Sequence, residues 1–170
     1  MNATDGGSVS ETQNVFADDW QEIYPPTEGW RSNQRRLVPP GHDLGMSLYE
    51  LLPGQTQCPY HFHHGDEELI VILRGRPTLR TPDGERQLAP GDFVHFPKGP
   101  EGAHQMINRC DEPARYVVGS SNVAPEICEY PDSGKVAVFS RLESQRGQRL
   151  ITVHRLDDGV DYFDGEQPKG

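Results

Sequence analysis

The sequence lacks any long hydrophobic run. Its longest uninterrupted aliphatic stretch, Leu69 to Leu73, is far shorter than the roughly 20 apolar residues that a membrane-spanning helix needs. The polar N-terminus also contains no apolar stretch of the kind found in secretory signal peptides. These absences argue against a membrane protein and predict a cytoplasmic one.

Basic residues are scarce. The chain has 16 Lys and Arg against 26 Asp and Glu, which gives a formal net charge of -10. Nucleic acids and anionic membrane surfaces attract clustered Lys and Arg, and the sequence has no dense basic run. It also has no helix-turn-helix pattern at either end. We therefore expect no nucleic-acid partner, no membrane partner and no role as a transcription regulator.

Cysteines are few and are not spaced for a shared task. The three residues Cys58, Cys110 and Cys128 form no C-x-x-C pair, which argues against a disulfide framework and against a structural zinc site. The pattern predicts reduced thiols that are mostly buried. It also excludes cysteine from the predicted metal ligands.

Helical periodicity is missing as well. Apolar residues recur at short intervals, often alternating, and no long window keeps the spacing of an amphipathic helix. The turn sequences at 82–84 and 131–134 combine Pro, Asp and Gly and predict hairpins. The chain is therefore predicted to be all-β, a sandwich or a barrel. Strands are expected at 46–52, 68–74, 77–80, 86–88, 92–96, 104–108, 114–121, 126–130, 135–141 and 149–156.

A chain of 170 residues is long enough for one core and too short for two ordinary domains. We predict a single domain at 13–165, flanked by a disordered leader at 1–12 and a disordered tail at 166–170. The N-terminal arm, 13–40, contains Trp20, Tyr24 and Trp30, which are expected to pack on the domain or on a second subunit. A ligand-binding role for the tryptophans is the alternative. The C-terminal strand and tail, 142–165, are expected to cover the domain or a partner subunit.

The chemistry concentrates at residues 59–75. Alternate residues of a strand share a face, so His61 and His63 can point their imidazoles at one place while Phe62 turns away. Glu68 then begins a strand whose same-face neighbours are Ile70 and Ile72. A carboxylate and two imidazoles at the mouth of an apolar interior need a partner, and a divalent metal ion supplies one. Surface histidines in an acidic loop are the alternative.

At this point the chain resembles the cupin superfamily. The first cupin motif is a glycine, His-x-His, a glutamate and a second glycine, and the second motif is a glycine, Pro-x-Gly, a histidine and an asparagine. The gaps before His61 and His104 are longer than usual, and motif spacing favours Glu68 over its rival Glu67. The matching residues are Gly54, His61, His63, Glu68 and Gly75, then Gly91, Pro97, Gly99, His104 and Asn108.

The resemblance implies a double-stranded β-helix, or jelly roll, with a metal inside one end and frequent dimerisation, here as a homodimer. The implied ligands are His61, His63, Glu68 and His104, a mixed set that suits Fe, Mn, Ni, Cu or Zn. His104, Met106 and Asn108 would share a strand face that points into the barrel. His64 is expected outside the ligand set, beside the cluster. His42, His95 and His154 are expected to be structural.

Four protein ligands leave open positions for a small-molecule substrate or dioxygen. Ile70, Ile72, Met106 and Phe96 are expected to form an apolar pocket floor. The leading hypothesis is a metal-dependent enzyme, with an oxygenase ahead of an isomerase or a lyase. A non-catalytic metal or ligand binder is one alternative. A zinc-dependent sugar-phosphate isomerase is another, and it would need a basic pocket near Arg74, Arg80, Lys98 or Arg109.

Overall fold

The computed structural model describes residues 11–23, 29–143 and 149–168. Most of the predicted leader, part of the predicted tail and Tyr24 lie outside these described residues. Within them, three single-turn 3-10 helices are the only helical segments, so the all-β prediction is confirmed. The helices are η1 (Pro100–Gly102), η2 (Pro131–Ser133) and η3 (Leu156–Asp158). The strands are β1 (Glu22–Ile23), β2 (Asn33–Arg36), β3 (Gly45–Leu51), β4 (Phe62–His63), β5 (Glu68–Arg74), β6 (Thr78–Thr81), β7 (Gly84–Gln87), β8 (Phe93–Phe96), β9 (Gln105–Ile107), β10 (Ala114–Ser120), β11 (Glu126–Tyr130), β12 (Lys135–Glu143) and β13 (Arg149–Arg155).

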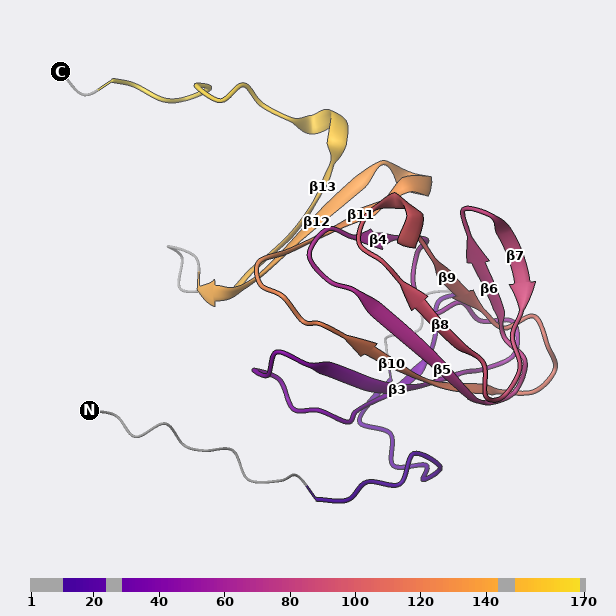
Figure 1. The fold of residues 1–170 in the computed structure, drawn as a ribbon. Coiled ribbons are helices and arrows are strands. Elements are labelled where there is room, and N and C mark those ends of the chain that lie inside the picture. The colour runs from indigo at the N-terminus through magenta and orange to yellow at the C-terminus, as the bar shows by residue number, and fades with distance from the viewer. Residues whose placement is uncertain (1–10, 24–28, 144–148, 169–170) are drawn as a thin grey trace, which may run out of the picture.

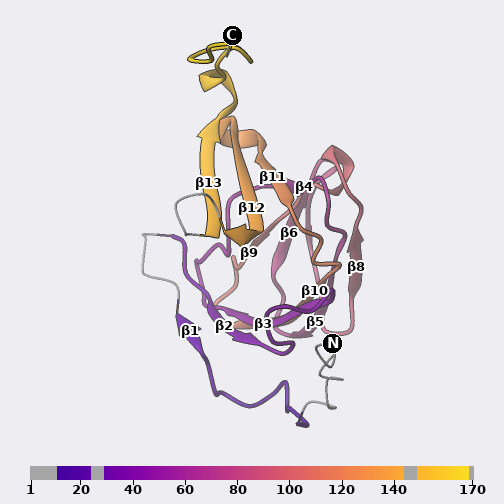
Figure 2. The ribbon, with the colours of Figure 1, turned by 90° about the vertical axis from the view of Figure 1, so that its left-hand side faces the viewer.

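The strands form three antiparallel sheets. The largest has the order β1-β2-β3-β10-β5-β8, the second β13-β12-β11-β4, and the third β7-β6-β9. Strands β3, β5 and β10 of the six-stranded sheet lie below the four-stranded sheet in both views of the ribbon (Figures 1 and 2). Both predicted hairpins are present, because β6 pairs with β7 and β11 pairs with β12.

The hydrophobic core lies between the six-stranded sheet and the three-stranded sheet. Along β5, buried side chains alternate with partly exposed neighbours, as expected for a sheet that is apolar on one face. On β5, Ile70 and Ile72 are buried, so Glu68 stands two residues earlier at the end of the same apolar face. The core residues are Leu51, Ile70, Ile72, Leu79, Leu88, Phe96, Met106 and Tyr116.

Part of the predicted N-terminal arm is a strand. The sequence of β2, Asn-Gln-Arg-Arg, has no apolar residue, yet Gln34 and Arg35 are buried. The side-chain amide of Gln34 donates to the Tyr49 hydroxyl at 2.9 Å, and Arg35 forms an ion pair with Asp19. Strand β2 pairs with β3 along its whole length. Polar contacts, which hydrophobic periodicity does not report, therefore hold this strand in the sheet.

The C-terminal segment does not cover the barrel. It runs away from β13 as an extended trace (Figure 1), and Val160, Tyr162 and Phe163 are all exposed. The expectation that this tail covers the domain is therefore wrong for a single copy of the chain. Within the described residues, no helix is both long enough and apolar enough to span a bilayer.

Candidate metal centre

The two histidines of the His-x-His sequence lie on one side of the segment that contains β4. Phe62, between them, is buried in a small cluster with Tyr60 and Ala103 on the other side. The backbones of His61 and His104 form an antiparallel bridge with N–H to O=C distances of 3.2 and 2.9 Å. This bridge brings the second sequence motif beside the first.

The four predicted ligands come together. Oε2 of Glu68 lies 3.1 Å from Nε2 of His104 and 3.5 Å from Nε2 of His63. The ring of His61 lies 4.9 Å from that of His63 and 4.7 Å from that of His104, measured between centroids. The rival carboxylate, Glu67, is exposed and contacts His95 instead. The geometry therefore brings Glu68, and not Glu67, to the histidines.

In His61 and His104, the Nδ1 ring nitrogen contacts a backbone carbonyl oxygen. Nδ1 of His61 lies 2.9 Å from the carbonyl oxygen of Pro59, and Nδ1 of His104 lies 2.9 Å from that of Gly102. A carbonyl oxygen only accepts, so these Nδ1 atoms donate and each neutral ring keeps its lone pair on Nε2. Such partners orient imidazole ligands in metalloproteins.

His63 is held by a carboxylate. Its Nδ1 lies 3.2 Å from Oε1 of Glu126, a buried residue of β11 that also accepts from the backbone N–H of His64. Its Nε2 is buried, and within the described chain it finds no well-formed hydrogen bond beyond the 3.5 Å approach to Glu68. An orphaned imidazole nitrogen beside a carboxylate fits a metal ion, because the ion takes up both lone pairs.

The electrostatic environment keeps His61 neutral and Glu68 ionised, as metal ligation requires of both. Burial, followed by the neighbouring His104 and His63, lowers the pKa of His61 to about 4. Burial of Glu68 acts to raise its pKa, but the close approach of His104 and His63 outweighs burial and holds that pKa well below its usual range. The site therefore presents a neutral imidazole and an ionised carboxylate at neutral pH.

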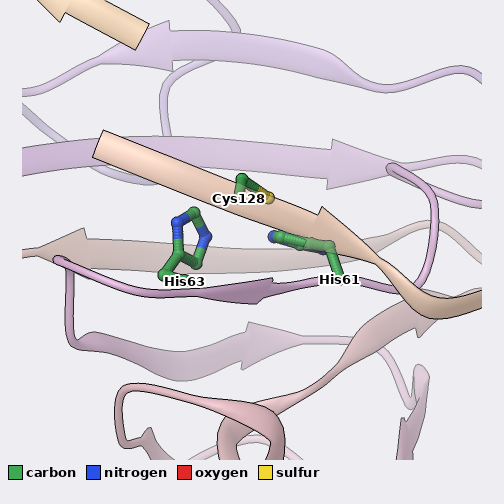
Figure 3. A group of neighbouring side chains, drawn as sticks. All are labelled: His61, His63 and Cys128. Atoms are coloured by element: carbon green, nitrogen blue, oxygen red, sulfur yellow. The ribbon is translucent and has the colours of Figure 1, made fainter. Parts of the chain in front are cut away.

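A sulfur atom belongs to the same cluster. Cys128 on β11 is buried, and its Sγ and one ring nitrogen of each of His61 and His63 lie within 4.8 Å of one another. Figure 3 shows the three side chains on neighbouring segments. Burial raises the pKa of the Cys128 thiol to about 12. The sequence did not predict that Cys128 would lie beside both histidines. All three cysteines are free thiols as predicted, with Cys128 buried and Cys58 and Cys110 partly exposed.

A cavity of about 550 Å³ opens onto the cluster. Ile70 lines it as predicted, together with Trp30, Tyr49 and Val118. The other predicted floor residues, Ile72, Met106 and Phe96, belong to the core instead. Phe96 nevertheless supports the site, because its ring stacks on that of His104 with 3.8 Å between centroids. Trp30 therefore lines the cavity, as a ligand-binding role for this tryptophan would require.

The remaining histidines lie outside the ligand cluster. His64 is exposed and contacts Glu129 on β11 at 2.7 Å, and His154 contacts Thr152 at 2.6 Å. His104 and Met106 are buried as the predicted strand face requires. Asn108 is also buried, where its side-chain amide donates to the carbonyl oxygens of Leu51 and Glu112. It stabilises the loop after β9 and does not contact the cluster.

Glu126 is expected to tune metal affinity without being a ligand. Replacing it with alanine removes the acceptor that orients His63, so we expect a loss of about 10- to 100-fold in affinity for Mn²⁺ or Zn²⁺. Glu126→Gln keeps an acceptor oxygen and should lose less. Isothermal titration measures the effect, with Glu129→Ala as the control because Glu129 contacts only exposed His64 among the histidines. Equal metal affinity in Glu126→Ala and wild type would show that Glu126 does not tune metal binding.

Metal binding is expected to weaken as the pH falls. Burial acts to lower the pKa of His63, but its close approach to Glu68 and the charges of Glu68 and Glu126 outweigh burial and raise that pKa. Ligation needs the neutral ring, so affinity should rise with pH up to the pKa of His63 and fall by up to about tenfold per unit below it. His61 adds no slope between about pH 5.5 and 8. Competitive titration over this range checks the slope, and a flat profile would contradict it.

Comparisons with known proteins agree with this geometry. The family model described as "Cupin domain" matches residues 47–119, and no curated protein matches the chain. A structure provisionally assigned as a sugar phosphate isomerase from Acidithiobacillus ferrooxidans is 25% identical, with a TM-score of 0.68 over 78% of this chain and 81% of that one. A sugar phosphate isomerase of the cupin superfamily from Silicibacter pomeroyi is 27% identical, with a TM-score of 0.65 over 78% and 82%.

A third structure shows likeness of fold alone. The polyketide cyclase RemF from Streptomyces resistomycificus is 23% identical, with a TM-score of 0.55 over 68% of this chain and 84% of that one. The jelly-roll fold expected from the two sequence motifs is therefore confirmed.

Proposed function

Because this chain is a cupin, with its cupin domain at residues 47–119, we propose that it is a metal-dependent enzyme acting on a small molecule. The proposed ligands are His61, His63, Glu68 and His104. The observation that carries the proposal is the convergence of three imidazoles on one buried carboxylate at the wall of a cavity. The orphaned Nε2 of His63 supports it.

The donor set fits Fe, Mn, Ni, Cu or Zn and does not choose among them. When bound, such an ion polarises a substrate oxygen or lowers the pKa of a bound water molecule. The chain orients the histidine ligands and limits the access of water to the metal. Backbone carbonyls fix the rings of His61 and His104, while Trp30, Tyr49 and Val118 give the cavity a mainly apolar wall that limits access of water.

The cavity wall also carries a positioned polar group. Gln57 lines the cavity, and its side-chain oxygen accepts a hydrogen bond from the buried Tyr116 hydroxyl at 2.8 Å. The hydrogen bond orients the amide, so its N–H groups are available to donate to a polar group of the substrate. A ligand with one polar, chelating end and an apolar or aromatic body fits this combination of walls.

We propose an oxygenase as the reaction class. The mixed nitrogen and oxygen ligands suit Fe(II), and the apolar wall protects a reactive complex. The test is anaerobic loading with Fe(II), followed by oxygen-uptake measurements over a panel of catechols, diketones and thiols. We expect uptake that depends on one of these substrates and is absent in His104→Ala. Full metal occupancy with a silent panel would favour a non-catalytic binding module instead.

A phosphorylated sugar is the second candidate substrate. Two similar structures are described as sugar phosphate isomerases, and a second cavity of about 570 Å³ shares Tyr49, Glu68 and Val118 with the first. Arg36 of β2 lines this second cavity. Of the cations expected from the sequence, Arg80 forms an ion pair with Asp132 and Arg109 with Glu85. Thermal shift with sugar phosphates, in wild type and Arg36→Gln, tests whether Arg36 binds the phosphate group.

We also propose that the protein is a homodimer. Cross-strand pairing places Ile151 and Val153 of β13 on the same sheet face as Cys128, the face that points into the barrel. They are nevertheless 56% and 53% exposed, because the β12–β13 hairpin extends beyond the barrel (Figure 1). A second copy of the chain would bury this apolar surface.

The double variant Ile151→Asp/Val153→Asp is expected to be monomeric, because two carboxylates on this face oppose its burial. Light scattering after size-exclusion chromatography measures the mass, and Thr152→Asp on the opposite face of β13 is the control. A wild-type protein that is monomeric at micromolar concentration, or a double variant that remains dimeric, would contradict the proposal.

A further inference from the structure

We propose that Cys128 gives this barrel a second donor set, His61, His63 and Cys128, which captures thiophilic metal ions such as Cu⁺, Zn²⁺ and Cd²⁺. The inference rests on the proposed function only because both use His61 and His63 as metal ligands. The first set joins those histidines to Glu68 and His104. The second joins them to a sulfur atom, which no sequence motif includes.

The placement of Cys128 follows from strand pairing. Strand β11 pairs with β4 in antiparallel register, with Cys128 directly opposite His63. Directly paired residues project from the same face of a sheet, and residues two apart along a strand do so too. His61 therefore joins His63 and Cys128 on one face, and the three donor atoms lie within 4.8 Å of one another. Figure 3 shows Cys128 above the segment that carries both histidines.

The nearby Cys58 does not belong to this set. Its Sγ lies 3.6 Å from Nδ1 of His61, the nitrogen that also contacts the carbonyl oxygen of Pro59 at 2.9 Å. Among the described residues, the group of donor atoms that joins both histidines to a sulfur contains Cys128 and not Cys58. This difference makes Cys58 the matched control for Cys128.

The two donor sets favour different ions. Carboxylate and imidazole suit Mn²⁺ and Fe²⁺, whereas thiolate with imidazole suits Cu⁺, Zn²⁺ and Cd²⁺. On binding, the S–H bond of Cys128 breaks, the sulfur–metal bond forms and the proton passes to water. Because His61 and His63 serve both sets, one ion excludes the other. A thiophilic ion would therefore displace a catalytic one.

The test is titration of the metal-free, full-length protein with Cd²⁺ under anaerobic conditions, followed by thiolate-to-metal charge-transfer absorption in the ultraviolet. We expect the band in wild type, Cys58→Ser and His104→Ala. We expect it to vanish in both Cys128→Ser and Cys128→Ala, with Cd²⁺ affinity reduced by at least about tenfold. Thermal melts of both Cys128 variants establish that they are folded. A band that persists in folded Cys128 variants, or is absent from wild type, overturns the inference.

A parallel titration with Mn²⁺ separates this inference from the proposed function. Mn²⁺ should bind wild type and both Cys128 variants alike, and should bind His104→Ala poorly. Loss of Mn²⁺ binding to wild type with an intact Cd²⁺ band would contradict the proposed function and leave the second set in place. Normal Mn²⁺ binding without the Cd²⁺ band would contradict the second donor set and leave the proposed function in place.

Discussion

Replacing His61 or His104 with alanine is expected to remove nearly all Mn²⁺ or Fe²⁺ from the purified protein. In the proposed site each imidazole supplies one Nε2 to a shared point. Alanine offers no replacement donor, and the nearby Cys128 sulfur suits thiophilic ions rather than Mn²⁺ or Fe²⁺. The loss of affinity should exceed the 10- to 100-fold loss that follows removal of a residue that only hydrogen-bonds to a metal ligand. Elemental analysis of protein purified without an affinity tag measures the occupancy.

Two further variants sharpen this prediction. His95→Ala removes an exposed histidine that contacts Glu67, so its metal content should equal that of wild type. Glu68→Gln should weaken binding less than either alanine variant, because one carbonyl oxygen donor remains. An unaltered metal content in both His61→Ala and His104→Ala would show that the metal does not bind at the proposed site. An equal or larger loss in Glu68→Gln would show that the charge of Glu68 dominates.

Gly102→Ala is expected to destabilise the whole site. Gly102 is buried, and a Cβ there would overlap the carbonyl oxygen of Pro97 and approach its carbonyl carbon at 2.9 Å. Both are backbone atoms that cannot turn aside. Forced overpacking of this kind costs about 1–3 kcal/mol, so the melting temperature should fall by about 2–4 °C for each kcal/mol lost.

The same substitution should also lower metal affinity, because the carbonyl oxygen of Gly102 accepts from Nδ1 of His104. Differential scanning calorimetry and metal titration on one preparation measure both effects. Gly159→Ala is the control, since the nearest atom to an added Cβ there is 3.9 Å away. Wild-type stability and affinity in Gly102→Ala would show that this loop moves freely and does not position His104.

The sequence predicted the parts of this molecule that depend on short-range pattern. Strand β5 begins and ends where apolar alternation placed it, and Glu68, Ile70 and Ile72 share a face as expected. His61 and His63 were identified for the same reason. His104 lies more than forty residues further along the chain, and its position beside His61 followed from the second sequence motif.

The parts that the sequence did not predict depend on pairing between distant strands. Glu126 and Cys128 lie two apart on a strand that was predicted correctly, yet their contact with His63 depends on the register between β11 and β4. Strand β4 is two residues long and leaves no periodic signal. Trp30 reaches the cavity from a segment that appeared to be an extended arm, because polar contacts hold the adjoining β2 in the sheet.

Anomalous diffraction from crystals grown with Mn²⁺ tests the central claim most directly. We predict one strong peak in each chain, within bonding distance of Nε2 of each of His61, His63 and His104 and of a carboxylate oxygen of Glu68. A peak elsewhere, or a map in which these imidazoles point apart toward solvent, would contradict the account.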